Sequence, residues 1–212
     1  MQPESPNAGR TYTTGPITTG NLERVSAPAT EPVTLALAKN HLRITDYTDD
    51  DALISGLITA AREFCEKAQN RIYIESEMTY SLSGIPSVGR EIWLPVLPIK
   101  SIDKVIIAQK GTENGIEIPA DQYDVDLKDG KLALNRSFAT DYDADLLPRY
   151  NGFIIEFTAG YGEPADVPQI VKQAILLIVG HLYEHREETS DGKELKEIPM
   201  GATRMLRIDK AY

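Results

Sequence analysis

The sequence predicts an α+β fold in which N-terminal helices and a long C-terminal helix form a helical core, with a small antiparallel β-sheet domain inserted between them. Three observations support it. Two helical stretches come first, the middle of the chain then alternates apolar and polar side chains, and a nearly all-apolar helical stretch follows. With 212 residues, 42% of them hydrophobic and 25% charged, the chain can build a sizeable core.

Residues 1–31 differ from the rest of the chain because they are rich in Thr, Pro and Gly. Beyond Met1, their only large aliphatic side chains are Ile17, Leu22 and Val25. Such a stretch buries too little apolar surface to offset its ordering entropy, so we predict an extended arm that is flexible when free. Two alternatives stay open: a disordered tail, or an arm that orders against a neighbouring subunit through Ile17 and Leu22.

Two helices open the core, which is predicted over residues 32–188. Thr34 can cap a short helix over 34–43, and the acidic residues before the next helix suit its positive end. That second helix, over 50–69, has an apolar stripe with a period of 3.6 residues and a polar face. The stripe contains Leu53, Ile54, Leu57, Ile58, Ala61, Phe64, Cys65 and Ala68, and the polar face contains Arg62, Glu63, Glu66 and Lys67.

The period changes from about residue 72 to residue 158, where apolar and polar side chains alternate as they do in strands. Asp129-Gly130 is the strongest hairpin signal in the chain, with apolar alternation on both sides. We expect one antiparallel sheet of five or six strands. Trp93 lies in a short strand of this section, where it could pack in the sheet or anchor a subunit interface.

A long helix is expected over 168–186, with Pro168 in its first turn. It is apolar around most of its circumference, which indicates a position at the centre of a core or between subunits. The charged tail over 189–212 ends in a mixture of basic and apolar side chains. This mixture, on an acidic protein, suggests a partner-binding segment made of Arg204, Met205, Leu206, Arg207 and Tyr212.

The formal net charge of −10 argues against several classes of protein. A nucleic-acid-binding protein needs clustered Lys and Arg to hold phosphates, and so does a protein bound to an anionic membrane surface. We expect no membrane span, no signal peptide and, because Cys65 is the only cysteine, no intrachain disulfide. The composition gives no reason to expect a cofactor.

The sharpest chemical motif is His181-Leu-Tyr-Glu184-His185, which matches the H-x-x-E-H pattern of inverted zinc peptidases. Two imidazoles four residues apart on a helix could share one metal ion, and Glu184 could activate water. Against this, such chemistry needs a third protein ligand, and His185 also suits the negative end of a helix. A zinc hydrolase is therefore the alternative from a different class of function, and we expect no catalytic residues.

The order of several segments resembles a family of tailed-phage proteins. The segments that carry the likeness are Val33–Arg43, Asp50–Glu66, Leu94–Ile102, Phe157–Gly162, and Gln173–Leu177 followed by Tyr183-Glu184. The family is the head–tail connector, or head-completion adaptor, of siphophage-like particles, prophages and gene transfer agents. The likeness covers residues 32–188. The arm before residue 32 departs from the family pattern, as does the second histidine, His185.

The resemblance implies a structural virion protein without enzymatic activity, located in the neck and present in the host cytoplasm during assembly. It implies a homo-oligomeric ring under the portal protein, expected to be twelve-fold. The ring would extend the DNA channel without sequence-specific DNA binding and would offer a platform to the next tail or stopper protein. The C-terminal residues from Arg204 to Tyr212 are expected to dock on the portal. Another tail-completion protein of similar size is a further alternative.

Overall fold

The computed structural model describes residues 20–111, 115–185 and 200–207 of the chain. It contains four α-helices, eight strands and two short 3-10 helices within those residues. In chain order the elements are β1 (Asn21–Arg24), α1 (Leu35–Leu42), α2 (Asp51–Gln69), β2 (Ser76–Leu82), β3 (Ile92–Trp93), β4 (Ile99–Ile107), β5 (Ile116–Glu117), η1 (Ala120–Gln122), β6 (Tyr123–Asp126), β7 (Lys131–Leu134), η2 (Ala144–Leu146), β8 (Phe153–Ala159), α3 (Gln169–Glu184) and α4 (Met200–Arg207).

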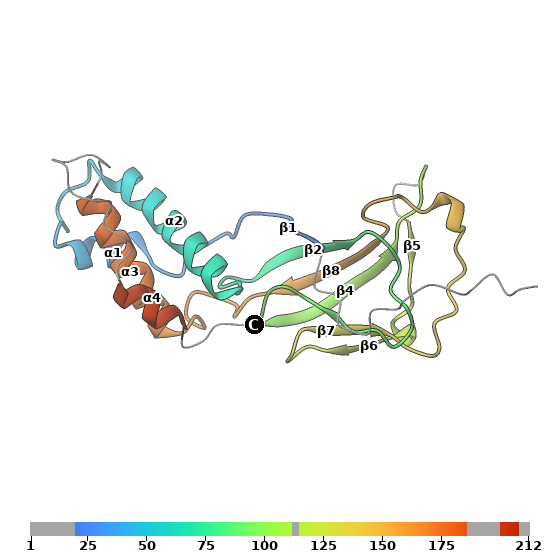
Figure 1. The fold of residues 1–212 in the computed structure, drawn as a ribbon. Coiled ribbons are helices and arrows are strands. Elements are labelled where there is room, and N and C mark those ends of the chain that lie inside the picture. Colours follow the sequence, from blue (N-terminus) through green and yellow to red (C-terminus); the bar gives the residue numbers. More distant parts are fainter. Residues whose placement is uncertain (1–19, 112–114, 186–199, 208–212) are drawn as a thin grey trace, which may run out of the picture.

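The molecule is elongated, with its helices gathered at one end and its sheets at the other (Figure 1). Each end has its own hydrophobic core, because the two sets of buried apolar side chains form separate clusters. The segment between α2 and β2 joins them, since Tyr73 belongs to the helical core and Ile72 to the sheet core. The α+β class predicted from the sequence is confirmed.

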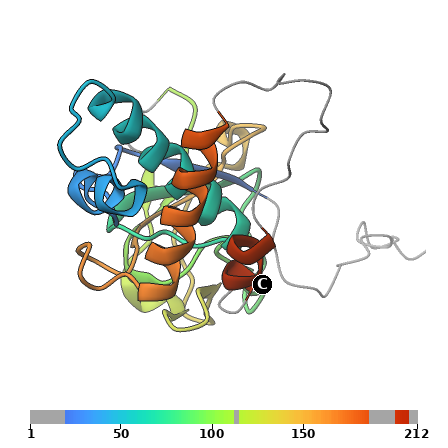
Figure 2. The same cartoon turned by 90° about the vertical axis from the view of Figure 1, so that its left-hand side faces the viewer.

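At the helical end, α3 lies in the middle and packs against α1, α2 and α4 (Figure 2). Its buried side chains are distributed widely around the helix, which explains why the sequence is apolar on most of its circumference. The predicted helices over 34–43, 50–69 and 168–186 agree with α1, α2 and α3 within two residues. The predicted cap is also confirmed, because the Thr34 hydroxyl accepts a hydrogen bond from the N–H of Leu37 at 3.2 Å.

The strands form two antiparallel sheets instead of the single sheet that we expected. The larger has the order β1-β2-β8-β4-β5, and the smaller has the order β3-β7-β6. Their facing sides bury one shared core, with β2, β4 and β8 on one side and β3 and β7 on the other. Alternation along the chain predicts strands but cannot show how they divide between sheets, so this part of the prediction was wrong.

The predicted hairpin is present. Strands β6 and β7 pair from Tyr123 opposite Leu134 to Asp126 opposite Lys131, and the loop between them contains Asp129-Gly130. Gly130 has φ of +62°, a left-handed conformation that favours glycine over other residues. The local turn chemistry therefore fixes this register, as the sequence indicated.

Two elements fall where we predicted none. Strand β1 lies inside the predicted arm and pairs antiparallel with β2 at the edge of the large sheet, from Asn21 opposite Ser81 to Arg24 opposite Met78. Helix α4 lies inside the predicted C-terminal tail and packs against α3 and α2. No helix in the described part of the chain is long and apolar enough to cross a membrane.

Candidate assembly surfaces

A buried ionic cluster ties the N-terminal segment to α2. Both carboxylate oxygens of Glu66 accept hydrogen bonds from Nη2 of Arg24 at 3.0 Å. The same carboxylate accepts from Nη1 of Arg62 at 2.7 Å and from the backbone N–H of Tyr73 at 2.9 Å. Because Arg24 lies on β1 and Tyr73 lies just before β2, the Glu66 carboxylate joins α2 to the sheet end of the molecule.

Arg62 continues this cluster toward the chain before α1. Its Nε donates to Glu31 at 2.8 Å, and the other oxygen of Glu31 accepts from the Thr59 hydroxyl at 2.9 Å. Burial alone would lower the pKa of Arg62, but the attraction of Glu66 and Glu31 outweighs it, so the pKa is raised. The guanidinium therefore stays charged, and the cluster holds residues 24–31 against α2.

The burial of Arg62 and Glu66 corrects the face that we assigned to α2. We placed both side chains on its polar face, yet Arg62 is 2% exposed and Glu66 is 7% exposed. Leu53 and Phe64, assigned to the buried stripe, are instead 40% and 38% exposed. The four-residue spacing of Arg62 and Glu66 was the available signal for an ion pair, but it did not reveal that the pair is buried.

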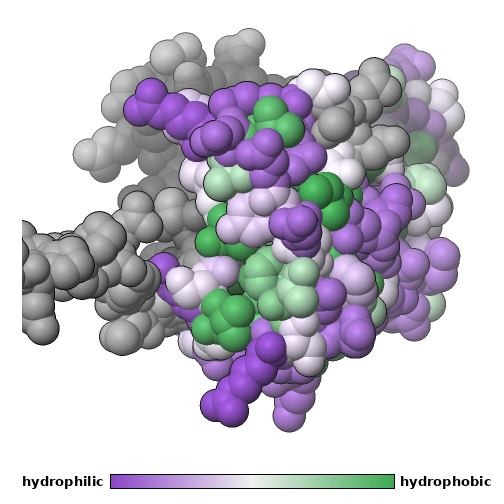
Figure 3. Space-filling model, turned by 90° about the vertical axis from the view of Figure 1, so that its right-hand side faces the viewer, coloured by the Kyte–Doolittle hydropathy of each residue, from purple (hydrophilic) through white to green (hydrophobic). Residues whose placement is uncertain are grey.

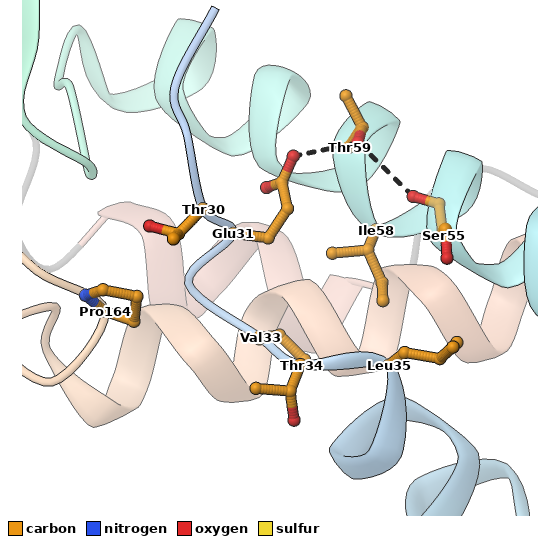
Figure 4. A pocket seen from close by; sticks show the side chains of 9 residues that line it. All are labelled: Thr30, Glu31, Val33, Thr34, Leu35, Ser55, Ile58, Thr59 and Pro164. Atoms are coloured by element: carbon orange, nitrogen blue, oxygen red, sulfur yellow. Dashed lines mark hydrogen bonds between the residues drawn. The ribbon is translucent and has the colours of Figure 1, made fainter.

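A shallow groove of about 380 Å³ lies between the segment before α1, helix α2 and Pro164 (Figure 4). Part of its polar lining is already bonded, because the Thr59 hydroxyl donates to Glu31 at 2.9 Å and lies 3.3 Å from the backbone carbonyl oxygen of Ser55. Apolar side chains such as Val33 and Ile58 form the rest of the lining. The groove offers no pair of converging catalytic groups and is best described as a surface depression.

Helix α4 presents a mixed surface at the helical end. Arg204 and Arg207 are exposed, and Met205 is half-buried. Leu206 is buried in the helical core, and its carbonyl oxygen accepts a hydrogen bond from Nε2 of Gln69 at 2.8 Å. With α4 in this position Leu206 anchors the helix within the subunit, and the surface that remains for a partner is basic.

The other residues proposed for interfaces lie in different places. Leu22 packs partly buried against the sheet core from β1, so its apolar surface is used within the subunit. Trp93 is half-buried on β3, where its Nε1 donates to Glu91 at 2.9 Å and the Lys131 ammonium lies 5.0 Å from its ring centre. Ile17 and Tyr212 lie outside the described residues.

His181 of the H-x-x-E-H motif lies in the last turn of α3, and His185 is the C-cap residue that follows the helix. Their ring centres are 4.6 Å apart, and Nδ1 of His185 lies 3.0 Å from the carbonyl oxygen of His181. Glu184 is exposed. Within residues 20–111, 115–185 and 200–207, no group of three or more His, Cys, Asp or Glu side chains is arranged to hold a metal ion. Among these residues the motif therefore has no third ligand of the kind that zinc chemistry requires.

The opposite end of the molecule, formed by the ends of the sheets, carries only small apolar patches. Figure 3 shows them separated by hydrophilic residues across this face. Along the segments between β2 and β3 and between β7 and β8, the exposed apolar side chains include Val88, Leu146 and Tyr150. Isolated exposed apolar side chains are normal on a protein surface, so this face gives no clear docking site.

Comparison with known proteins supports the resemblance read from the sequence. Residues 32–128, a little under half of the chain, match the family model of the phage gp6-like head-tail connector protein. No curated protein sequence matches the chain significantly.

Solved structures with the same fold come from gene transfer agent (GTA) particles. A chain in the neck of an empty GTA particle with C6 symmetry has a TM-score of 0.69 and 20% identity, and the match covers 91% of this chain and 96% of that one. A chain in the native GTA virion has a TM-score of 0.68 and 19% identity, with coverage of 90% and 95%. A chain in the native GTA neck with C12 symmetry has a TM-score of 0.69 and 18% identity, with coverage of 91% and 96%.

At these identities the matched structures establish the fold alone. The family match covers less than half of the chain, and it agrees with the head–tail connector family that the sequence resembles. Neither comparison supports the alternative of a zinc hydrolase. The matched family and fold are those of structural proteins of virion necks.

Proposed function

We propose that the chain acts as a head–tail connector by forming a ring beneath the portal of a tailed particle. The ring would extend the DNA channel and give the next tail or stopper protein a surface to attach to. The observation that carries this proposal is the fold, with a helical end and a sheet end, which over most of its length resembles chains of symmetric particle necks. Twelve copies would match the symmetry of the portal.

A ring of this kind closes when each copy contacts the next through two different faces. The elongated subunit suits this arrangement, because its long sides are available to neighbours while its two ends are available to other components (Figure 1). Trp93, Ile17 and Leu22 remain our proposal for contacts between subunits. Strand β1 already holds Leu22 against the sheet of its own subunit. Of the two arm residues, Ile17, which precedes Gly20, is therefore the one that would reach a neighbour.

We assign portal docking to the basic face of α4 and to the residues that follow it. Arg204 and Arg207 are one helical turn apart and exposed, Met205 is half-buried between them, and Tyr212 would extend the same surface. Leu206 supports this surface from inside by packing into the helical core. Exposed basic side chains on a chain with a net charge of −10 favour an acidic partner surface.

The net charge also suits passage of DNA through the ring. If acidic side chains line the channel, they repel the phosphate backbone and DNA slides without being held. Such a ring surrounds DNA without reading its sequence. A ring whose channel wall is basic or neutral would contradict this part of the proposal. Assembly would take place in the host cytoplasm, and the finished ring would stay in the virion neck.

The proposal is tested by removing the gene from cells that make the particle and restoring it on a plasmid. We expect filled or partly filled heads without tails in its absence, and complete particles with the wild-type gene. Arg204→Glu combined with Arg207→Glu should weaken binding to purified portal at least tenfold. Lys110→Glu should not, because this exposed residue follows β4 and lies beside η2 at the far end of the sheets (Figure 1). Tailed particles without the gene would overturn the proposal.

A further inference from the structure

We infer that the outer face of α2 is the surface through which one copy of this chain packs against the next copy in the ring. The inference rests on the proposed function and names the contact that the ring would use. It begins with four apolar side chains, Leu53, Leu57, Ala60 and Phe64, which we call the α2 seam. They follow a spacing of four, three and four residues along one face of the helix.

The α2 seam borders the face that the subunit buries and shares Leu57 with it. Ile54, Ile58, Ala61 and Cys65 face the helical core, while Leu53, Ala60 and Phe64 are exposed and Leu57 is half-buried. Spacing of four and three residues is the pattern by which a helix packs its side chains against another helix. Leu57 also packs against the helical core, so Leu53, Ala60 and Phe64 are the part of the seam that stays exposed among the described residues.

Gly56 adds an independent observation. It lies in the second turn of α2 beside the seam, is exposed, and has open space where a side chain would be. A glycine destabilises a helix interior relative to alanine, and neither a turn nor a close contact inside this subunit requires it. Together with Ala60 it leaves a low area between the bulky Leu53 and Phe64. A second chain could approach the helix backbone closely at this place.

A second copy is the occupant that the chain itself favours. Residues 1–19 and 186–199, outside the described part, contain few apolar side chains and no apolar repeat that would match the seam. A ring-forming chain, in contrast, must present an exposed face to a neighbour on each side. The other exposed large apolar side chains of the described residues are spread singly over α1, β6, η2 and several loops, as Leu37, Val125 and Val88 are, and do not form a regular stripe.

The inference is tested with a photo-reactive amino acid, p-benzoylphenylalanine, in place of Phe64 in the full chain, produced in cells that make the particle. After irradiation and purification of particles, we expect an adduct of twice the chain mass of 23.5 kDa, with the cross-link from position 64 to another copy. An adduct with a different particle protein, or no adduct although the chain is in the particles, would overturn the inference and leave the connector function standing. If the wild-type chain is absent from particles, the proposed function itself fails.

A substitution separates folding from assembly. Gly56→Gln introduces a good helix former at an open position, so the variant should melt at the same temperature as the wild type or higher. It should reduce incorporation into particles at least tenfold, because the added side chain fills the low area of the seam. Gly84→Gln is the matched control, since Gly84 is also exposed with open space around it but lies in a loop of the sheet end. Normal incorporation of Gly56→Gln would contradict the inference.

Discussion

The carboxylate of Glu66 shows how single residues hold this molecule together. It lies on α2 with one side toward the helical core and receives hydrogen bonds from β1, from its own helix and from the backbone before β2. A buried charge of this kind is tolerable only when its hydrogen-bonding capacity is satisfied. Glu66 therefore fixes the junction between the two ends and keeps the N-terminal segment on the subunit.

Replacing Glu66 with alanine should lower the free energy of unfolding by about 3–5 kcal/mol, because the buried guanidinium of Arg62 would lose the carboxylate that pairs with it. Glu63→Ala is the control, because the Glu63 carboxylate lies 3.5 Å from the same Arg62 guanidinium but is 65% exposed. Its removal should lower the free energy of unfolding by less than about 0.5 kcal/mol. Urea unfolding followed by circular dichroism measures both. Equal effects would show that burial of the pair is irrelevant.

The buried thiol of Cys65 gives a prediction about pH. Burial, with a smaller effect from the Glu66 charge, raises the pKa of Cys65 to about 12 from its ordinary value of 9.0. The unfolded chain thus loses this proton first, so the thiol's contribution to stability is complete below pH 9 and is lost as the pH rises toward 12.

Between pH 8 and about pH 10.5 the wild type should lose about 2 kcal/mol more stability than Cys65→Ala, as measured by urea unfolding at each pH. The comparison with the alanine variant removes the contributions of tyrosines such as Tyr73, whose pKa burial also raises. Parallel pH curves for the two proteins would contradict this account of the thiol.

At the scale of elements, α4 is held by one buried hydrogen bond and two buried side chains. Gln69 on α2 donates to the carbonyl oxygen of Leu206 and accepts from the Tyr73 hydroxyl, while Ala202 and Leu206 fill the helical core. An eight-residue helix is marginal by itself in water. Its stability must therefore come from these tertiary contacts, which position the basic residues on its outer face.

Leu206→Ala should consequently release α4 from the subunit. The lost burial corresponds to about 2–5 kcal/mol for a leucine in a core, which is enough to unfold so short a helix locally. Hydrogen–deuterium exchange should then lose protection over 200–207 while α2 and α3 stay protected. Arg204→Ala, on the exposed side of the same helix, should leave the exchange unchanged. Uniform loss of protection in all helices would argue against local release.

How far the elements could be predicted depended on what stabilises each one. Helices α1 and α2 have apolar side chains with a period of 3.6 residues, and α3 is a long apolar stretch after Pro168, so their own sequences were enough to predict them. Strand β1 has one inward apolar side chain, Leu22, and forms because β2 offers an edge, which local sequence does not reveal. Helix α4 likewise forms because α2 and α3 offer it a surface to pack on, which its own short sequence does not reveal.

The surface of α2 was harder still to assign from sequence. Its apolar side chains form two stripes, and periodicity alone could not tell which one faces the subunit's own core. Gly56 costs the helix roughly 0.5–1 kcal/mol relative to alanine, a loss that the isolated subunit does not explain. A destabilising residue whose presence the contacts of a single subunit do not explain indicates a contact with another molecule.

At the scale of the whole molecule, the described residues form two separate cores, one at each end of an elongated subunit (Figure 1). The one catalytic pattern in the sequence, at His181 and His185, has no third ligand in the described part of the chain. The helical end presents two candidate contact surfaces, which are the α2 seam along its side and the basic face of α4. Such surfaces suit a subunit that works through its neighbours.

Cryo-electron microscopy of the neck in particles produced with this chain shows directly whether the chain forms the proposed connector ring. We predict a closed ring of copies of this fold between the portal and the tail, with the DNA channel running through its centre. The expected number of copies is twelve. A neck without this fold, or a chain found elsewhere in the particle or absent from it, would contradict the account.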